Sequence, residues 1–127
     1  MEQATQVFVA VSLLAIGLSH LLQPKAWVAY FQALAAQGAP GAFAEGFLCL
    51  SFGAIIVGFH NVWHGPALVV TLLGWGQVLK GLGRLVAPQL GVRVMSRASP
   101  DRAWLFQPGG VFALLLSGFA WWLRYRP

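Results

Sequence analysis

Charged residues are scarce in this chain. Only 9% of its 127 residues are Asp, Glu, Lys or Arg, whereas 58% are hydrophobic. Soluble domains usually carry about 25% charged residues. The shortage of charge excludes an ordinary soluble domain and indicates an integral membrane protein. The length is that of one compact domain, so we expect a single domain over residues 1–127.

Acidic residues and cysteine are both scarce. The chain has 3 Asp and Glu residues and 1 cysteine. Cys49 has no partner for an intramolecular disulfide, and no CxxC or Cys/His zinc spacing is present. Its place inside an apolar run predicts a small buried side chain. There are no paired carboxylates, no nucleophile elbow and no phosphate loop, so we predict neither enzymatic activity nor a bound cofactor.

Long hydrophobic runs, in contrast, are abundant. Four of them are separated by Pro- and Gly-containing breaks: about Ala4–Leu22, Ala42–Phe59, Pro66–Val86 and Phe106–Leu123. A helix needs about 20 residues to cross the hydrocarbon core of a bilayer. The first and third runs have this length, and the other two are slightly short. Because backbone groups in lipid must be satisfied internally, we predict an all-α fold, a polytopic bundle of four transmembrane helices.

The two longer connections between these runs are expected to contain short helices. In residues 25–37 the apolar residues recur at helical spacing, which is typical of an amphipathic helix in the membrane interface. In residues 91–97, Arg93 and Arg97 are four positions apart. We interpret both segments as helices that pack beneath the bundle.

Basic residues gather at one end of the predicted bundle. The chain has 8 Lys and Arg residues, and its net charge is +5. Those in the two long connections or at the adjoining helix end are Lys25, Lys80, Arg84, Arg93, Arg97 and Arg102. The positive-inside rule places both connections in the cytoplasm and both termini outside. Because the orientation of the chain in the membrane accounts for the excess of basic residues, we expect membrane lipids as partners and no nucleic acid.

An internal repeat is visible when the sequence is shifted by 64 positions. Gly17 and Pro24 then align with Gly81 and Pro88, and Gly46 aligns with Gly110. Each copy contains two of the predicted membrane helices, repeat 1 being about 1–64 and repeat 2 about 65–127. We therefore predict two hairpin repeats in parallel orientation, an arrangement that occurs in transporters.

The repeated unit resembles the YjeT-like family of two-helix bacterial inner-membrane proteins. In the first copy the resemblance is carried by GLSHLLQPKAW, Gly17 to Trp27, followed by two helix glycines. The second copy, GLGRLVAP from Gly81 to Pro88, has Gly91 where the family's tryptophan would stand. The chain looks like a tandem version of this family. The resemblance implies a bacterial inner membrane and no established biochemical activity.

The polar residues that interrupt the apolar helices define a candidate site. Gln77, Lys80 and Arg84 follow one helical stripe, while Glu45 and His20 lie near the same end of two other helices. A charge within the membrane is costly unless it is paired or reaches the interface. The residues therefore form ion pairs with Glu45, line a pocket for an anionic headgroup or small solute, or reach lipid phosphates.

His60 and His64 are weaker candidates for a metal or haem site. Their spacing would place both imidazoles on one face of a helix. Gly65 and Pro66 follow directly, however, and no third ligand is evident on that side. Interfacial histidines beside a turn are the alternative interpretation, and no metal is predicted.

Three functions remain open at this level. We expect a non-enzymatic membrane subunit that associates with itself or with a membrane protein partner, because small residues recur at spacings that allow close helix contact. The second hypothesis is a transporter or channel for a small solute or ion, with the Glu45–Lys80–Arg84–His20 region at its cytoplasmic mouth. The third is a redox subunit that binds metal or haem through His60 and His64.

Overall fold

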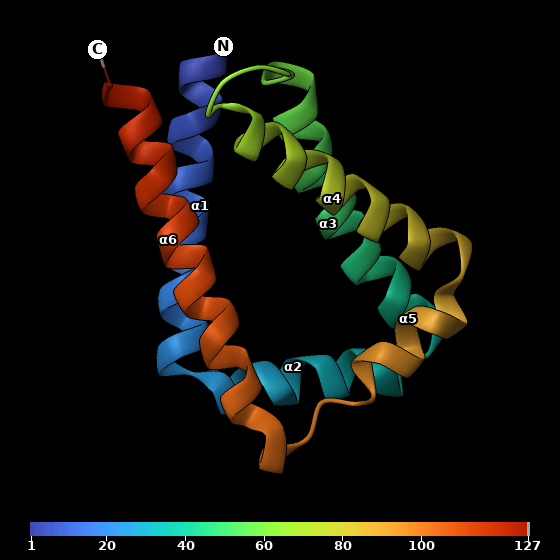
Figure 1. Ribbon diagram of the computed structural model, residues 1–127. Coiled ribbons are helices and arrows are strands. Elements are labelled where there is room, and N and C mark those ends of the chain that lie inside the picture. Colours follow the sequence, from blue (N-terminus) through green and yellow to red (C-terminus); the bar gives the residue numbers. More distant parts are fainter. Residues whose placement is uncertain (127) are drawn as a thin grey trace.

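The computed structural model describes residues 1–126, and they form an all-helical molecule (Figure 1). The elements in chain order are α1 (Glu2–Leu22), α2 (Pro24–Ala36), α3 (Ala39–Phe59), α4 (Leu68–Val86), α5 (Pro88–Met95), η1 (Pro100–Leu105) and α6 (Phe106–Tyr125). The predicted all-α fold class is therefore confirmed.

Prolines explain most of the boundaries. Pro24, Pro88 and Pro100 each stand at the start of a helical segment, where the missing N–H is not needed. The second apolar run was expected to begin at about Ala42, whereas α3 begins at Ala39 and includes Pro40 in its first turn. The short helices expected in the two long connections are present as α2 and α5.

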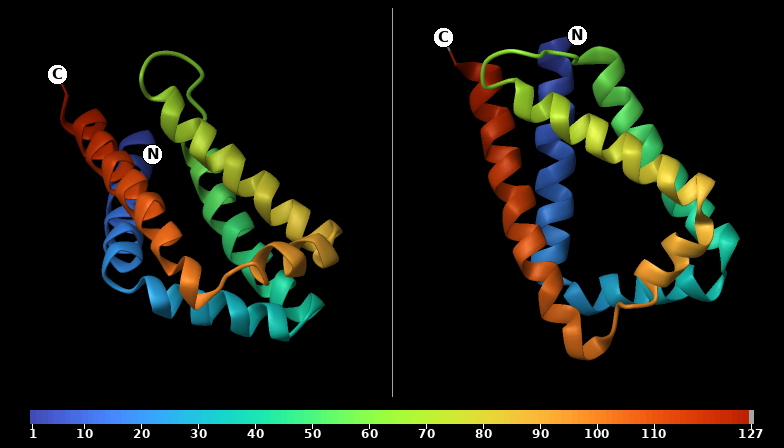
Figure 2. Two further views of the ribbon diagram at one scale, coloured as in Figure 1. Left: turned by 60° about the horizontal axis from the view of Figure 1, so that its bottom comes forward. Right: turned by 45° about the vertical axis from the view of Figure 1, so that its right-hand side comes forward.

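The four long helices form two closely packed pairs. One pair is α1 with α6, and the other is α3 with α4 (Figures 1 and 2). In the first pair, the Ser117 hydroxyl donates a hydrogen bond of 2.6 Å to the carbonyl oxygen of Ala10. In the second pair, a Cβ built on Gly81 would lie 2.6 Å from the backbone nitrogen of Leu50, so the backbones approach closely.

The two pairs meet near the N-terminus and diverge toward α2 and α5 (Figures 1 and 2). At the meeting point, Gln6 of α1 contacts the buried His60, Nε2 to Nε2, at 3.2 Å. His60 Nδ1 lies 3.2 Å from the Thr71 hydroxyl of α4. At the other end α2 and α5 cross the base, and Leu34, Ala42 and Met95 form a small core there.

Three helical segments are long and apolar enough to cross a membrane: Glu2–Leu22, Ala39–Phe59 and Pro100–Tyr125. They identify a membrane protein. The third predicted span, Pro66–Val86, corresponds to α4 and is not among them, since Gln77, Lys80 and Arg84 reduce its apolar character. Many large apolar side chains of the long helices are exposed, as expected for surfaces that face lipid tails.

Candidate functional site

Glu45 is the centre of the polar cluster. Its side chain is only 6% exposed, and its Oε1 lies 3.1 Å from Lys80 Nζ. Arg84 donates from Nε to Glu45 Oε2 at 2.7 Å, and the Cys49 thiol donates to Oε1 at 3.3 Å. Both ion pairs considered from the sequence are therefore present. The single carboxylate is shared by two cations.

Close packing of α3 and α4 makes this cluster possible. Gly46 follows Glu45, and a Cβ there would lie 2.7 Å from Cβ of Arg84. Lys80 and Arg84 are one helical turn apart, so both reach the same carboxylate from one face of α4. The Arg84 side chain is 13% exposed and that of Lys80 is 41% exposed, which leaves Lys80 accessible to a ligand.

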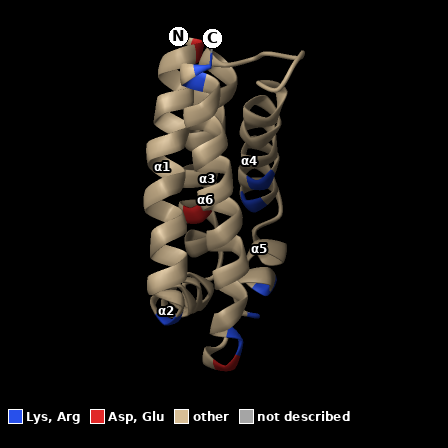
Figure 3. Ribbon diagram, turned by 60° about the vertical axis from the view of Figure 1, so that its left-hand side comes forward, with Lys and Arg blue, Asp and Glu red and all other residues tan. Residues whose placement is uncertain are grey.

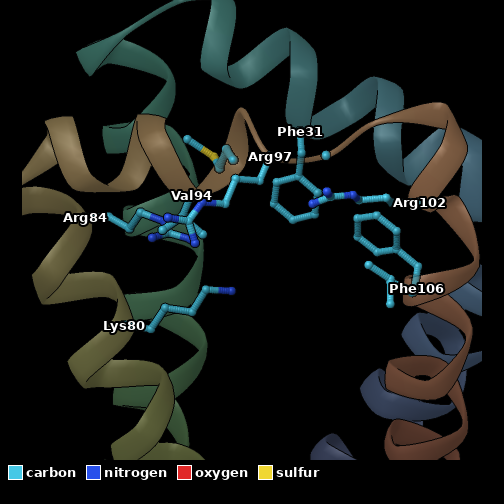
Figure 4. A pocket seen from close by; sticks show the side chains of 10 residues that line it. Phe31, Lys80, Arg84, Val94, Arg97, Arg102 and Phe106 are labelled. Carbon is cyan, nitrogen blue, oxygen red and sulfur yellow. The ribbon is translucent and has the colours of Figure 1, made fainter.

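A pocket of about 510 Å³ opens beside this cluster, between α4 with α5 and the start of α6. Its lining residues are Phe31, Lys80, Arg84, Val94, Met95, Arg97, Ala98, Arg102, Leu105 and Phe106. Figure 4 shows Lys80 extending into the open space and Arg84 and Arg97 extending toward each other. Arg102 reaches inward from the opposite wall (Figure 4).

The structure adds Arg97 and Arg102 to the residues expected from the sequence. Both lie in the connection between α5 and α6, where their charges were interpreted only as determinants of topology. The sequence signal that could have identified them as site residues is the accumulation of arginines in this connection. Sequence spacing alone does not show that the connection folds back toward Lys80. Figure 3 shows the Lys and Arg residues of α4 and α5 on one side of the view and that of α2 on the other.

His20 and Gln77 do not line the pocket. The His20 ring stacks on Trp27, with 4.1 Å between ring centroids, and its Nδ1 lies 2.8 Å from the carbonyl oxygen of Ile16. His20 belongs to the α1–α6 pair and is separated from Lys80 by the divergence of the two pairs. Gln77 is half-buried on α4, one turn before Lys80.

The two remaining histidines lie beyond the end of α3, so they do not share a helix face. Both ring nitrogens of His60 are occupied by Gln6 and Thr71, and burial lowers its pKa below the ordinary value. His64 is exposed in the connection to α4. Across residues 1–126, no group of three or more His, Cys, Asp and Glu side chains is placed to hold a metal ion.

Comparison with protein-family models, curated proteins and solved structures gives no match for this chain. The function must therefore be argued from the site. Four cationic side chains line one pocket, and Glu45 neutralises part of their charge. Such a site can hold an anion through charge-assisted hydrogen bonds, which are stronger than neutral ones. The apolar lining residues can hold the rest of the bound molecule.

Proposed function

We propose that the chain is a four-span membrane protein whose cytoplasmic-side pocket binds an anionic headgroup or small solute. The observation that carries the proposal is the convergence of Lys80, Arg84, Arg97 and Arg102 on one pocket that contains no acidic lining residue. Like charges placed together repel, and an anion bound among them removes this cost. The role is binding or transfer of the anion rather than chemistry on it.

The proposal includes α4 as the fourth span. In its support, α4 runs beside α3 over much of its length, and its cations are held by Glu45 of α3. Pairing reduces the cost of placing a charge at membrane depth. With four spans, the connection that carries Lys25 and the connection that carries Arg93, Arg97 and Arg102 lie on the same side, which the positive-inside rule assigns to the cytoplasm.

The proposal also includes the two hairpin repeats. A Cβ on Gly17 would lie 2.9 Å from the carbonyl oxygen of Gly110, and one on Gly81 would lie 2.7 Å from that of Gly46. The shift of 64 positions that converts Gly17 into Gly81 also converts Gly46 into Gly110. Equivalent close contacts in α1–α6 and α3–α4 support duplication of one unit. The similarity to YjeT-like proteins and a bacterial inner membrane stay part of this proposal.

Self-association or partner binding stays a second prediction. Several of the small residues that suggested it are used within the α3–α4 pair, where Gly53, Gly74 and Gly81 allow close contact between the helices. The pocket is therefore the more specific guide to function. Transport of the bound anion also stays a prediction, which Lys80→Ala tests through flux into liposomes. Unchanged flux would exclude a role of Lys80 in conduction.

Native mass spectrometry of the full chain tests the proposed binding. The protein would be released from nanodiscs of phosphatidylethanolamine and phosphatidylglycerol. We expect wild type to retain an anionic molecule, which Arg97→Gln/Arg102→Gln loses. Arg93→Gln is the matched control, because Arg93 is an exposed arginine of α5 outside the pocket lining. A wild-type protein without any bound anion would contradict the proposal, as would equal retention by the double variant.

A further inference from the structure

The cations of the pocket fall into two groups. Arg84 is largely buried and bonded to Glu45, so its charge is already compensated. Arg97 and Arg102 form no salt bridge with any residue in the described part of the chain. Lys80 shares properties of both groups, because its Nζ contacts Glu45 while its side chain remains 41% exposed. A bound anion therefore finds Arg97 and Arg102 available, with Lys80 as a third donor.

The walls of the pocket are apolar. Phe31 of α2 stacks on Phe106 of α6, with ring centroids 5.7 Å apart. Val94 and Leu105 also line the pocket, although they are 50% and 51% exposed. A small hydrated anion would leave these apolar surfaces in water. An amphiphile would cover them, and burial of apolar surface favours binding.

The position of the pocket relative to the helix ends is suited to a lipid whose headgroup lies at the membrane surface. Lys80 lies six residues before the last residue of α4, a helical rise of about 9 Å. Arg97 lies in the connection after α5, and Arg102 lies in η1, at the start of the apolar segment Pro100–Tyr125. The cations therefore extend from the interface into the hydrocarbon region. The α3–α4 and α1–α6 pairs diverge at this end (Figure 2), and the pocket is lined by Lys80 and Arg84 of the first pair and by Phe106 of the second.

The geometry points to an anionic phospholipid of the cytoplasmic leaflet as the bound molecule, a conclusion that rests on the proposed function. Arg97 and Arg102 bind its phosphate, and Lys80 contributes a further donor from the wall of α4. Arg84 is a positioning residue, because Glu45 fixes it at the edge of the site. The acyl chains pack on Phe31, Leu105 and Phe106 and continue between the two helix pairs.

Calorimetric titration of the full chain in a neutral detergent separates the lipid from a soluble anion. The probes are dihexanoyl phosphatidylglycerol, dihexanoyl phosphatidylcholine and inorganic phosphate. We expect phosphatidylglycerol to bind about tenfold or more tightly than phosphatidylcholine, since each basic residue near an anionic lipid contributes about 1 kcal/mol. Arg97→Gln/Arg102→Gln should lose this preference, and Arg93→Gln should keep it.

A wall variant provides the second test. Leu105→Gln should weaken phosphatidylglycerol binding several-fold and leave inorganic phosphate unchanged, because only the lipid covers the wall. Binding of phosphate alone would overturn the lipid assignment and leave the proposed anion site standing. Absence of binding by all three probes would overturn both. Equal phosphatidylglycerol affinity in wild type and the double arginine variant would also overturn the inference. Helical circular dichroism and a single elution peak serve as folding controls for each variant.

Discussion

Glu45 is the residue on which the polar part of the molecule depends. It is the acid that meets Lys80 and Arg84, and its side chain is almost fully buried. Removing one partner of a buried ion pair is costly because the other charge stays buried without compensation. Arg84 would suffer most from such a change, since Lys80 can still reach solvent.

Glu45→Gln should therefore destabilise the protein. The cost for a buried pair is about 3–5 kcal/mol, and we expect a loss near the lower end because Lys80 is partly exposed. Equilibrium unfolding in mixed micelles with increasing dodecyl sulfate measures this loss. Cys49→Ala is the control, since it removes only a thiol contact to the same carboxylate. Equal stability of Glu45→Gln and wild type would show that the pair contributes little.

His60 makes stability depend on pH. Burial lowers the pKa of His60 below its ordinary value of 6.5, although the nearby Glu2 partly opposes this effect. The unfolded chain therefore takes up a proton before the folded one does. The stabilising contribution is complete above pH 6.5 and is lost as the pH falls below that value toward the folded pKa.

We expect the melting temperature of wild type to fall between pH 8 and pH 5 by more than that of His60→Gln. His64→Gln, at an exposed histidine, should follow wild type. The difference between the two variants isolates the contribution of His60. Parallel pH profiles for wild type and His60→Gln would contradict the assignment.

At the scale of elements, the helix pairs depend on glycine contacts. Gly81 of α4 faces α3 so closely that an added Cβ would meet the backbone nitrogen of Leu50 at 2.6 Å. Gly83 lies on the same helix with no atom within 4 Å of an added Cβ. The backbone of α3 therefore leaves no room for a side chain at position 81, whereas position 83, less than one turn away, has room for one.

Gly81→Ala should destabilise the α3–α4 pair by about 1–3 kcal/mol, the usual cost of overpacking. Gly83→Ala should be neutral or stabilising by up to about 1 kcal/mol, because alanine favours the helix. Unfolding in mixed micelles compares the two variants with wild type. If both alanine variants lost the same stability, close packing at Gly81 would not be the cause.

The helices themselves could be predicted from sequence. Apolar runs and prolines located the four long helices, and helical spacing located α2 and α5. The pairing of α1 with α6 could not be read from local pattern, because it joins the two ends of the chain. The contact of Phe31 with Phe106 could not be read from local pattern either, because it also joins distant parts of the chain. The pocket depends on these long-range contacts, and so the position of Arg97 and Arg102 beside Lys80 could be found only from the structure.

At the scale of the whole molecule, the position of the pocket depends on whether α4 crosses the membrane. Glu2–Leu22, Ala39–Phe59 and Pro100–Tyr125 have the length and apolar character of spans. If only these cross, the connection after α3 and the connection after α5 lie on the same side. If α4 also crosses, the two connections lie on opposite sides, and the positive-inside rule then predicts that the pocket faces the cytoplasm.

Thiol labelling of single-cysteine variants decides between these arrangements. In a Cys49→Ala background, His64→Cys reports on the connection after α3, and Ser96→Cys reports on the segment after α5; both positions are exposed. Intact spheroplasts would be treated with a membrane-impermeant maleimide. Four spans predict labelling of His64→Cys in intact cells and of Ser96→Cys only after permeabilisation. Labelling of both variants in intact cells would show that α4 does not cross and that the pocket lies outside.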